Sequence, residues 1–199
     1  MFRLSPRLVI PQNSRSSAEY STEERRILLG IAHQSILNSF RTRGEDKTSF
    51  PHHLCEPRGV FTTLYLHGDL RGCVGYAMPV LALHRAVTET AKAAAFEDTR
   101  FLPVSETEAK ELEVSLSVLS ALFPIDPDAV EVGRHGLVAS MGPYRGLLLP
   151  QVPLESGWDR ETFLEQTCRK AGLPVDAWRS GAKFEAFTAE VFGDTDLAG

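Results

Sequence analysis

Cysteine is scarce in this chain, and the few that occur lack the spacing of cross-links or metal ligands. The 199 residues contain three cysteines, Cys55, Cys73 and Cys168. Three is an odd number and no Cys-x-x-Cys spacing occurs, so the sequence indicates neither a disulfide framework nor a zinc ribbon. We therefore expect a protein of the reducing cytoplasm.

Long apolar runs are also missing. The longest candidate extends from Val114 to Ile125 and contains three serines and a proline, whereas a helix that crosses a bilayer needs about 20 predominantly apolar residues. Near the N-terminus, residues 8–10 form the only apolar run before Pro11, which is too short for the core of a secretory signal. The sequence thus predicts neither a membrane protein nor a secreted one.

Positive charge is in deficit. Lys and Arg total 21 against 26 Asp and Glu, which gives a net charge of -5. The first 18 residues hold three Arg and no acid, which leaves a net charge of -8 on the rest of the chain. Because binding to nucleic acid depends on cationic contacts with phosphate, we expect no nucleic acid partner. Hydrophobic residues make up 43% of the chain, which is enough for a sizeable core.

Residues 1–20 are polar and have no periodicity, which predicts a flexible arm. The fold is expected over residues 21–192, followed by a short tail over residues 193–199. Ser21-x-x-Glu24 matches a helix capping box. An apolar stripe follows at Leu28, Ala32, Ile36 and Phe40. This spacing predicts an amphipathic helix that ends at Gly44.

Two β hairpins are expected. Residues 60–66 are rich in β-branched and aromatic side chains, and Gly68-Asp69 suits a two-residue type II′ turn into residues 70–76. This turn would place Cys73 opposite Leu64. Gly142-Pro143 joins residues 136–141 to residues 144–152 in the second hairpin, although Pro150 should end its regular pairing.

Further helices and strands complete the expected fold. One helix follows Pro79, a short one follows the Ser105-x-x-Glu108 capping box, and another begins after Asp159 and ends at Gly172. Residues 112–119 alternate between apolar and polar, and a last strand is expected over about residues 183–192. Helices and antiparallel hairpins thus mix without regular βαβ alternation. This pattern predicts the α+β class, with a mixed or antiparallel sheet flanked by helices.

The segment Arg71-Gly72-Cys73 is the most chemically suggestive part of the sequence. Residues two apart on a strand share a face, so Arg71 would favour the thiolate of Cys73 and make it the most reactive of the three thiols. Gly72 and Gly75 would let another backbone or a ligand approach closely. The alternative is that Cys73 is a small buried hydrophobic residue, as free cysteines usually are.

The polar face of the strand at residues 112–119 carries Glu113, Ser115 and Ser117. A carboxylate beside hydroxyls can act as a base or a binding group, but alternating strands usually turn such a face to solvent. Arg100 follows a helix and suits an anion site. An ion pair with Glu97 or Asp98 is an equal alternative.

Histidines offer weaker candidates. His135 lies between glycines, where it suits an acid, a base or a ligand, or simply satisfies the backbone of a turn. His52, His53 and Cys55 lack a second ligand pair at a metal-binding spacing, so we expect a surface loop and predict no metal site. No phosphate loop or dinucleotide fingerprint occurs, and no cofactor is predicted.

Six segments occur together in the order known from one protein family. They are LRGCVG at residues 70–75, DTRF at 98–101, EVSLSVLS at 113–120, VGRHGL at 132–137, LLPQV at 148–152 and KAGLP at 170–174. Taken together they resemble the AMMECR domain family, whose bacterial and archaeal members are called AmmeMemoRadiSam system protein A. The resemblance runs from about Ser21 to Phe192. Val74 and Thr99 stand where the family usually has Ile and Pro.

The resemblance implies more than the residues alone. It implies an α+β fold with a larger and a smaller subdomain that meet at a cleft. It also implies an association with Memo-type and radical-SAM proteins. The positions that match the family pattern are Arg71, Gly72, Cys73, Gly75, Arg100, Glu113, Ser115, His135 and Gln151.

Two functions are compatible with these residues. The first is an enzyme or enzyme component that acts on a small polar substrate, with Cys73 as nucleophile or thiol carrier, Arg71 favouring its thiolate, and Glu113 or His135 moving protons. Substrate would be bound by Gly72, Gly75, Arg100, Ser115 and Gln151. The second function is a non-catalytic module that docks a protein partner in the same cleft. The sequence leaves open which of the two applies.

Overall fold

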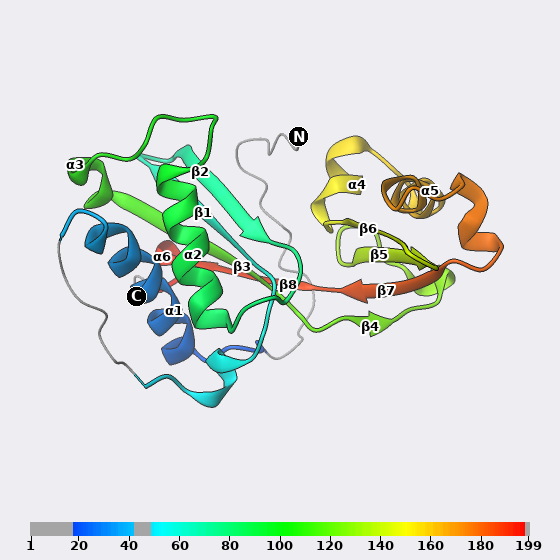
Figure 1. The fold of residues 1–199 in the computed structure, drawn as a ribbon, viewed down its shortest axis with the longest axis horizontal. Helices are drawn as coiled ribbons and strands as arrows, with labels where there is room; N and C mark the ends of the chain where they lie inside the picture. Colours follow the sequence, from blue (N-terminus) through cyan, green and yellow to red (C-terminus); the bar gives the residue numbers. More distant parts are fainter. Residues whose placement is uncertain (1–17, 42–48, 198–199) are drawn as a thin grey trace. The chain divides into compact units, whose positions relative to one another are not determined.

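The chain is organised in two compact units. A computed structural model describes residues 18–41 and 49–197. Within these ranges, unit 1 comprises residues 18–41, 49–118 and 190–197, and unit 2 comprises residues 119–189. Unit 2 is therefore inserted into the sequence of unit 1, and Figure 1 shows the elements of both.

Unit 1 is built on a four-stranded sheet. Its elements are α1 (Thr22–Asn38), η1 (His52–Cys55), β1 (Val60–Leu66), β2 (Asp69–Tyr76), α2 (Leu83–Phe96), α3 (Glu106–Ala109), β3 (Leu112–Leu119), β8 (Ala189–Gly193) and α6 (Asp194–Leu197). The strand order is β2-β1-β3-β8. Figure 1 shows α1 and α2 side by side, and α2 packs on β1 and β2. Their buried stripes, including Leu28, Ile36 and Val87, form one core with Leu64 and Leu116 of the sheet.

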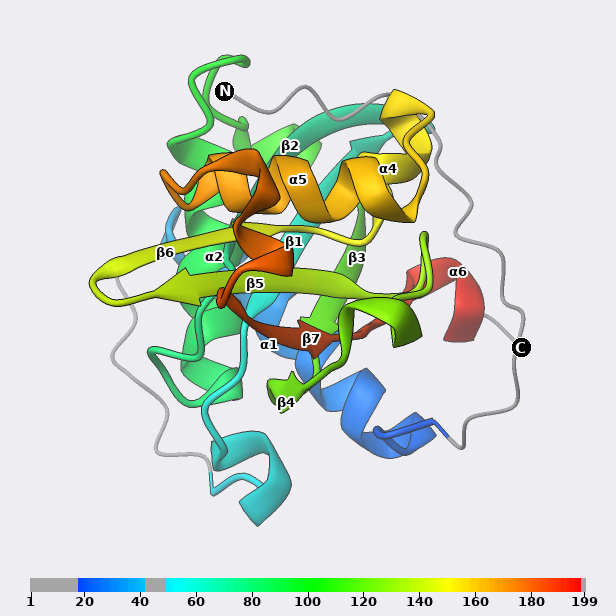
Figure 2. The ribbon, with the colours of Figure 1, turned by 90° about the vertical axis from the view of Figure 1, so that its right-hand side faces the viewer.

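Unit 2 has its own sheet and its own core. Its elements are β4 (Phe123–Pro124), η2 (Pro127–Ala129), β5 (Gly136–Met141), β6 (Tyr144–Leu148), α4 (Gln151–Ser156), α5 (Arg160–Lys170), η3 (Val175–Arg179) and β7 (Lys183–Phe187). The strand order is β4-β7-β5-β6. Helix α5 lies along β5 and β6 (Figure 2) and buries Phe163, Leu164 and Cys168 against Leu137 and Phe184. The α+β prediction is confirmed.

Local signals in the sequence place most helix starts correctly. The capping boxes predicted at Ser21 and Ser105 are both formed, with side-chain and backbone hydrogen bonds in each direction. The side chain of Asp159 caps α5, and Gly172 follows that helix with a left-handed φ of 76°. Helix α1 ends at Asn38 and residues 39–41 form a turn, so the helix predicted to reach Gly44 is too long; Gly44 itself lies outside the described residues.

The first hairpin is correct in its strands but wrong in its register. The turn residues are His67 and Gly68, both with positive φ (52° and 85°), so Leu66 pairs with Asp69. A bulge between Leu64 and Tyr65 then shifts the pairing by one residue. Cys73 therefore lies opposite Thr63, and the predicted partner Leu64 lies opposite Gly72.

The last predicted strand is interrupted. Residues 183–192 were expected to form one strand, but Thr188 separates β7, in the sheet of unit 2, from β8, in the sheet of unit 1. The backbone of Thr188 is bound at this point by Ser120, because Ser120 N–H donates to the Thr188 carbonyl at 2.9 Å and Thr188 N–H donates to Ser120 Oγ at 3.0 Å. In the second hairpin, β6 ends at Leu148 and Gln151 begins α4, so the expected strand to Val152 is too long.

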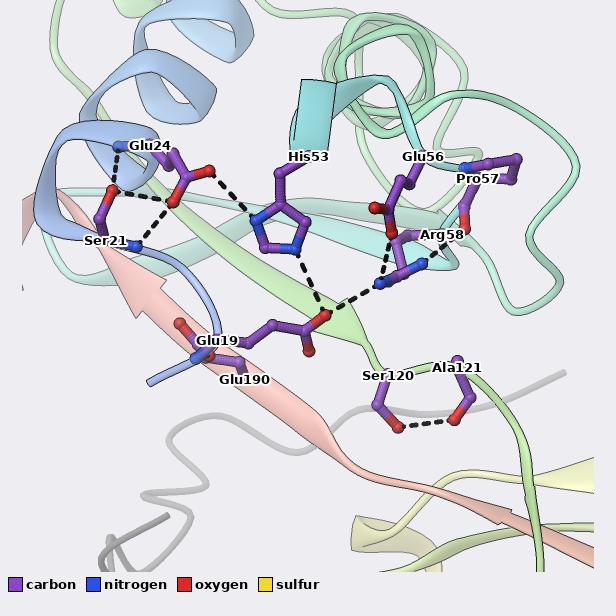
Figure 3. A network of polar contacts seen from close by, with 10 residues as sticks. All are labelled: Glu19, Ser21, Glu24, His53, Glu56, Pro57, Arg58, Ser120, Ala121 and Glu190. Atoms are coloured by element: carbon purple, nitrogen blue, oxygen red, sulfur yellow. Dashed lines mark hydrogen bonds and ion pairs between the residues drawn. The ribbon is translucent and has the colours of Figure 1, made fainter. Parts of the chain in front are cut away.

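The ordered part of unit 1 begins before Ser21. Tyr20 is 1% exposed and stacks on the ring of His53, with centroids 4.7 Å apart. Figure 3 shows the surrounding network, in which His53 lies 3.6 Å from Glu19 and 3.1 Å from Glu24, and Arg58 bonds Glu19 at 3.0 Å. The arm predicted over residues 1–20 is thus too long at its end, because Glu19 and Tyr20 belong to the fold.

The other end of the chain also packs on unit 1. Residues 194–197, expected to belong to a tail, form α6. Asp194 Oδ2 accepts a hydrogen bond from Val114 N–H at 2.7 Å and lies 2.9 Å from His33 Nε2. Among residues 18–41 and 49–197, no helix combines the length and the apolar character needed to cross a membrane.

A glycine in β2 provides a test of this packing. A Cβ on Gly72 would overlap the carbonyl oxygen of Ala94 in α2, whereas a Cβ on Gly30, on the exposed side of α1, would meet nothing within 4 Å. We expect Gly72→Ala to destabilise the protein by about 1–3 kcal/mol. The matched control Gly30→Ala should stabilise it by about 0.5–1 kcal/mol. Urea unfolding measures both, and an unchanged midpoint for Gly72→Ala would contradict the close approach of β2 and α2.

Candidate functional site

Three polar side chains, two of them predicted site residues, lie in one row across the sheet of unit 1. Thr63 of β1 pairs with Cys73 of β2 on one side and with Ser115 of β3 on the other. The hydroxyl of Thr63 donates a hydrogen bond to the Cys73 sulfur at 3.3 Å. All three side chains are half-buried. Because residues in register share a face, they lie on the side of the sheet opposite the buried Leu64 and Leu116, and we call this side the outer face.

The outer face also carries aromatic and acidic side chains in the neighbouring rows. Phe61 and Tyr65 flank Thr63 along β1, and Tyr65 pairs with Glu113. Burial raises the pKa of Tyr65, and the nearby Cys73 raises it further. Glu113 is exposed. Standard strand spacing places its Cα about 12 Å from that of Cys73. Ser115 thus adjoins Cys73 through Thr63, while Glu113 lies at the margin of the row.

The backbone of Cys73 is held by an aspartate and an arginine. Cys73 N–H donates to Asp98 Oδ2 at 2.9 Å, and Arg100 Nη2 donates to the Cys73 carbonyl at 3.3 Å. Arg100 and Asp98 also form an ion pair at 2.6 Å, which holds the pKa of Asp98 down at about 2. Since β2 is an edge strand, these side chains occupy backbone groups that an added strand would otherwise bind. The ion-pair alternative for Arg100 is therefore the one observed.

The environment of Cys73 favours the neutral thiol. Burial raises the pKa of Cys73 above its ordinary value, against the opposing effects of the Thr63 hydrogen bond and the Arg100 charge, while Asp98 raises it further. The expectation that Arg71 lowers the pKa of Cys73 is wrong, because this pKa is raised and Arg71 has no part in setting it. Cys55 is exposed and Cys168 is fully buried. The expectation that Cys73 is the most reactive thiol therefore loses its electrostatic basis.

Arg71 instead holds a neighbouring loop. Its Nε and Nη2 donate to the carboxylate of Glu108 at 3.0 and 3.3 Å, and its Nη1 donates to the carbonyl of Leu102 at 2.8 Å. The Arg71 hydrogen bond, with help from Ser105, lowers the pKa of Glu108 to about 2. The positive charge of Arg71 is thus neutralised by Glu108.

Both glycines of the segment are explained by internal packing. The backbone of Gly72 approaches the backbone of Ala94. Of the two expectations for Gly72, a close backbone or a close ligand, the close backbone is present. A Cβ on Gly75 would overlap the ring of Phe61 and lie 2.6 Å from the carbonyl oxygen of Val60. Their role as ligand-binding positions stays a prediction.

His135 and Gln151 belong to unit 2. The ring of His135 is buried, with 6% of the residue exposed, and its Nδ1 accepts the N–H of Glu131 at 3.0 Å. Burial lowers the pKa of His135, and the charge of Arg134 lowers it further. In this arrangement a neutral His135 accepts a hydrogen bond from a backbone N–H of the turn. Gln151 begins α4 and is half-buried. The expected meeting of both residues with Cys73 in one cleft stays a prediction.

Metal ligands do not gather in the part of the chain that the structure describes. No group of three His, Cys, Asp or Glu side chains there is placed to hold an ion. His53 faces Glu19 and Glu24, and His52 and Cys55 are exposed at η1.

Sequence reasoning missed two residues around Cys73. The sequence carries no signal for Thr63, because its position beside Cys73 depends on the bulge in the hairpin. The sequence indicates Asp98 only as a partner of Arg100, because the bond of Asp98 to the backbone of Cys73 joins segments 25 residues apart. The Asp-x-Arg spacing at residues 98–100 was the available signal.

The Arg71 ion pair generates a prediction about acid stability. A carboxylate whose pKa is lowered in the folded state stabilises that state above its unfolded pKa, and this contribution is lost as the pH falls. For Glu108 the window runs from its ordinary 4.5 down to about 2. Without Arg71 the pKa of Glu108 should return toward its ordinary value. We therefore expect the free energy of unfolding of Arg71→Met to fall less between pH 5 and about 2 than that of the natural protein.

The control for this experiment is Arg169→Met, which removes an exposed arginine of α5. The free energy of unfolding, measured in urea at several pH values, should keep its natural acid dependence in the control. Identical acid profiles for Arg71→Met and the natural protein would show that the ion pair does not shift Glu108.

Known proteins resemble this chain over most of its length. The AMMECR1 family model matches residues 29–192. A protein of Methanococcoides burtonii is 40% identical over 174 residues, which cover 83% of this chain and 87% of that protein. A protein of Thermococcus gammatolerans is 47% identical over 154 residues, which cover 71% and 75%.

A solved structure supports the same relationship. The crystal structure of an uncharacterized protein from Pyrococcus horikoshii matches with a TM-score of 0.64 and 40% sequence identity, over 83% of this chain and 89% of that one. The family match also spans all six sequence segments, from residue 70 to residue 174. The resemblance found in the sequence is confirmed, and the chain belongs to the AMMECR1 family.

Proposed function

We propose that the protein is an enzyme or enzyme component that binds a small polar ligand on the outer face of the unit 1 sheet. The observation that carries the proposal is the row formed by Cys73, Thr63 and Ser115. It presents one thiol and two hydroxyls on adjacent strands, and each is partly accessible. Such groups donate and accept hydrogen bonds and orient a polar molecule on a rigid scaffold.

The charges around the row define the class of ligand. Arg100 is neutralised by Asp98, and Arg71 is neutralised by Glu108. An anion would have to compete with these carboxylates for both guanidinium groups. A neutral molecule with hydroxyl or amide groups avoids this competition, and Glu113 at the margin can accept a hydrogen bond from it. The ligand is therefore a neutral polar molecule.

The state of the thiol defines the chemistry of Cys73. As a neutral thiol it is a weak hydrogen-bond donor and a poor nucleophile. A covalent role requires the thiol proton to be taken up by the bound ligand or by a base that arrives with it. In the absence of a ligand we expect no enhanced reactivity at Cys73.

Alkylation of the three cysteines tests this proposal. With iodoacetamide at neutral pH, Cys55 should react first because it is exposed, Cys73 more slowly, and Cys168 least. The rate at Cys73 should keep rising beyond the ordinary thiol pKa. Adding a cell extract restricted to small molecules should then slow the alkylation of Cys73 about fivefold when the ligand is at about four times its Kd. The alkylation rate of Cys55 should not change, so Cys55 serves as the internal control.

Two serines of β3 provide matched variants. Ser115→Ala removes a hydroxyl of the row, and Ser117→Ala removes the hydroxyl in the next row, opposite Phe61. Protection of Cys73 should be lost in Ser115→Ala and kept in Ser117→Ala. Equal alkylation of Cys73 with and without the extract, or equal effects of the two variants, would reject the ligand site.

A second candidate function is a non-catalytic module that docks a protein partner on the same face. The aromatic side chains favour it, because Phe61 and Tyr65 line the row and Tyr76, at the end of the edge strand, is 37% exposed. Aromatic residues are enriched in protein interfaces. The family resemblance points to Memo-type and radical-SAM proteins as the partners.

Direct binding measurements distinguish the partner classes. Purified Memo-type and radical-SAM proteins from the same genome should bind with a Kd in about the micromolar range or tighter, as specific interfaces do. Immobilised DNA and RNA should not retain the protein at physiological salt, because its net charge is -5. Tight retention on nucleic acid would overturn the charge argument, and no binding of either protein would reject these partners.

A further inference from the structure

Leu102 is the most exposed of the large hydrophobic residues that the structure describes. It is 83% exposed, compared with 64% for Val80, the next in order. It lies between α2 and α3, in the segment at residues 97–104. Phe101 on one side is half-buried and Val104 on the other is 3% exposed. Single exposed leucines are common on protein surfaces, so exposure alone indicates nothing.

The unusual feature is how firmly the segment that carries Leu102 is held. The Leu102 carbonyl accepts a hydrogen bond from Arg71, whose side chain is only 14% exposed and is paired with Glu108. Two residues earlier in the chain, Arg100 is fixed to Asp98 and to the carbonyl of Cys73. Residues from two distinctive segments of the sequence, 70–75 and 98–101, therefore fix the backbone at and just before Leu102.

The backbone of the segment is closed by further hydrogen bonds. Phe101 N–H donates to the Asp98 carbonyl at 3.0 Å, and Val104 N–H donates to the Ala95 carbonyl at 2.9 Å. The guanidinium of Arg100 lies over the ring of Phe101 at 5.5 Å. A loop fixed in this way loses little conformational freedom on binding, which is the main cost that a flexible loop would carry.

We propose that this segment is a docking element for a partner protein, with Leu102 inserted into an apolar pocket of that partner. The partner is defined further by charge. Asp98 and Glu108 are neutralised by their arginines, whereas exposed Glu97 and Glu106 lie five residues before and four residues after Leu102 in the chain. Glu106 has a solvent-exposed pair with Lys110, which screens it weakly, and Glu97 adds a second negative charge.

The pocket of the partner therefore carries Lys or Arg at its rim. Complementary charge of this kind speeds association and orients the two proteins, while the buried leucine supplies the affinity. This docking element is separate from the row of Cys73, Thr63 and Ser115, so it stands whether or not that row binds a small ligand.

Site-specific photocrosslinking in cells of the source organism tests the proposal. A diazirine amino acid placed at position 102 of the full chain should crosslink to a partner protein, and the linked peptide should lie in an apolar pocket with Lys or Arg at its edge. The same amino acid at position 80 is the control, because Val80 is also strongly exposed. Equal crosslinking from both positions, or none from position 102, overturns the proposal.

Affinity measurements with the purified crosslinked partner complete the test. Leu102→Ala should raise the Kd about tenfold or more, as expected for one buried leucine side chain, and Val80→Ala should leave it within about twofold. Glu97→Gln should slow association and reduce its dependence on salt. An unchanged urea midpoint for Leu102→Ala separates lost contact from lost folding. An unchanged Kd for that variant with a correctly folded protein overturns the proposal.

Discussion

The register of the β1–β2 hairpin is the constraint on which the candidate site depends. Side chains alternate between the two faces of a strand, so a shift of one residue would exchange every position. The turn at His67 and Gly68 and the bulge between Leu64 and Tyr65 act together. Their combined effect turns Cys73 to the outer face, beside Thr63, and turns Gly72 toward α2. With the simple hairpin expected from the sequence, Cys73 would lie opposite Leu64 in the core.

The same hairpin sets the electrostatics of the site. Because β2 is an edge strand, the N–H and carbonyl of Cys73 are free to bind Asp98 and Arg100, and these two side chains neutralise each other. The second arginine, Arg71, is neutralised by Glu108. A site with two arginines in its sequence motifs therefore carries almost no local positive charge. This explains why the thiol keeps a raised pKa although cations are close in sequence.

Signals confined to a few neighbouring residues were readable from the sequence. The capping boxes at Ser21 and Ser105, the cap at Asp159 and the alternation over residues 112–119 all produced the expected elements. Features that depend on distant residues were not. The bulge in the first hairpin, the pairing of Arg71 with Glu108 and the burial of Tyr20 all require contacts that the chain makes only once folded. The candidate residues were identified from their types and family pattern, but the role expected of Arg71 depended on such a contact.

The interruption at Thr188 illustrates why the end of the chain was hardest to read. Residues 183–192 have the composition of one continuous strand, yet β7 and β8 belong to different sheets. The chain leaves unit 1 after β3 and returns to it in β8, and these two strands are neighbours in the same sheet. Ser120 and Thr188 bond to each other where the chain leaves and returns. Unit 2 is thus an insertion whose two ends are joined by hydrogen bonds. Its entry and exit fall at one place, so the sheet of unit 1 is completed by a strand that lies some seventy residues further along the chain.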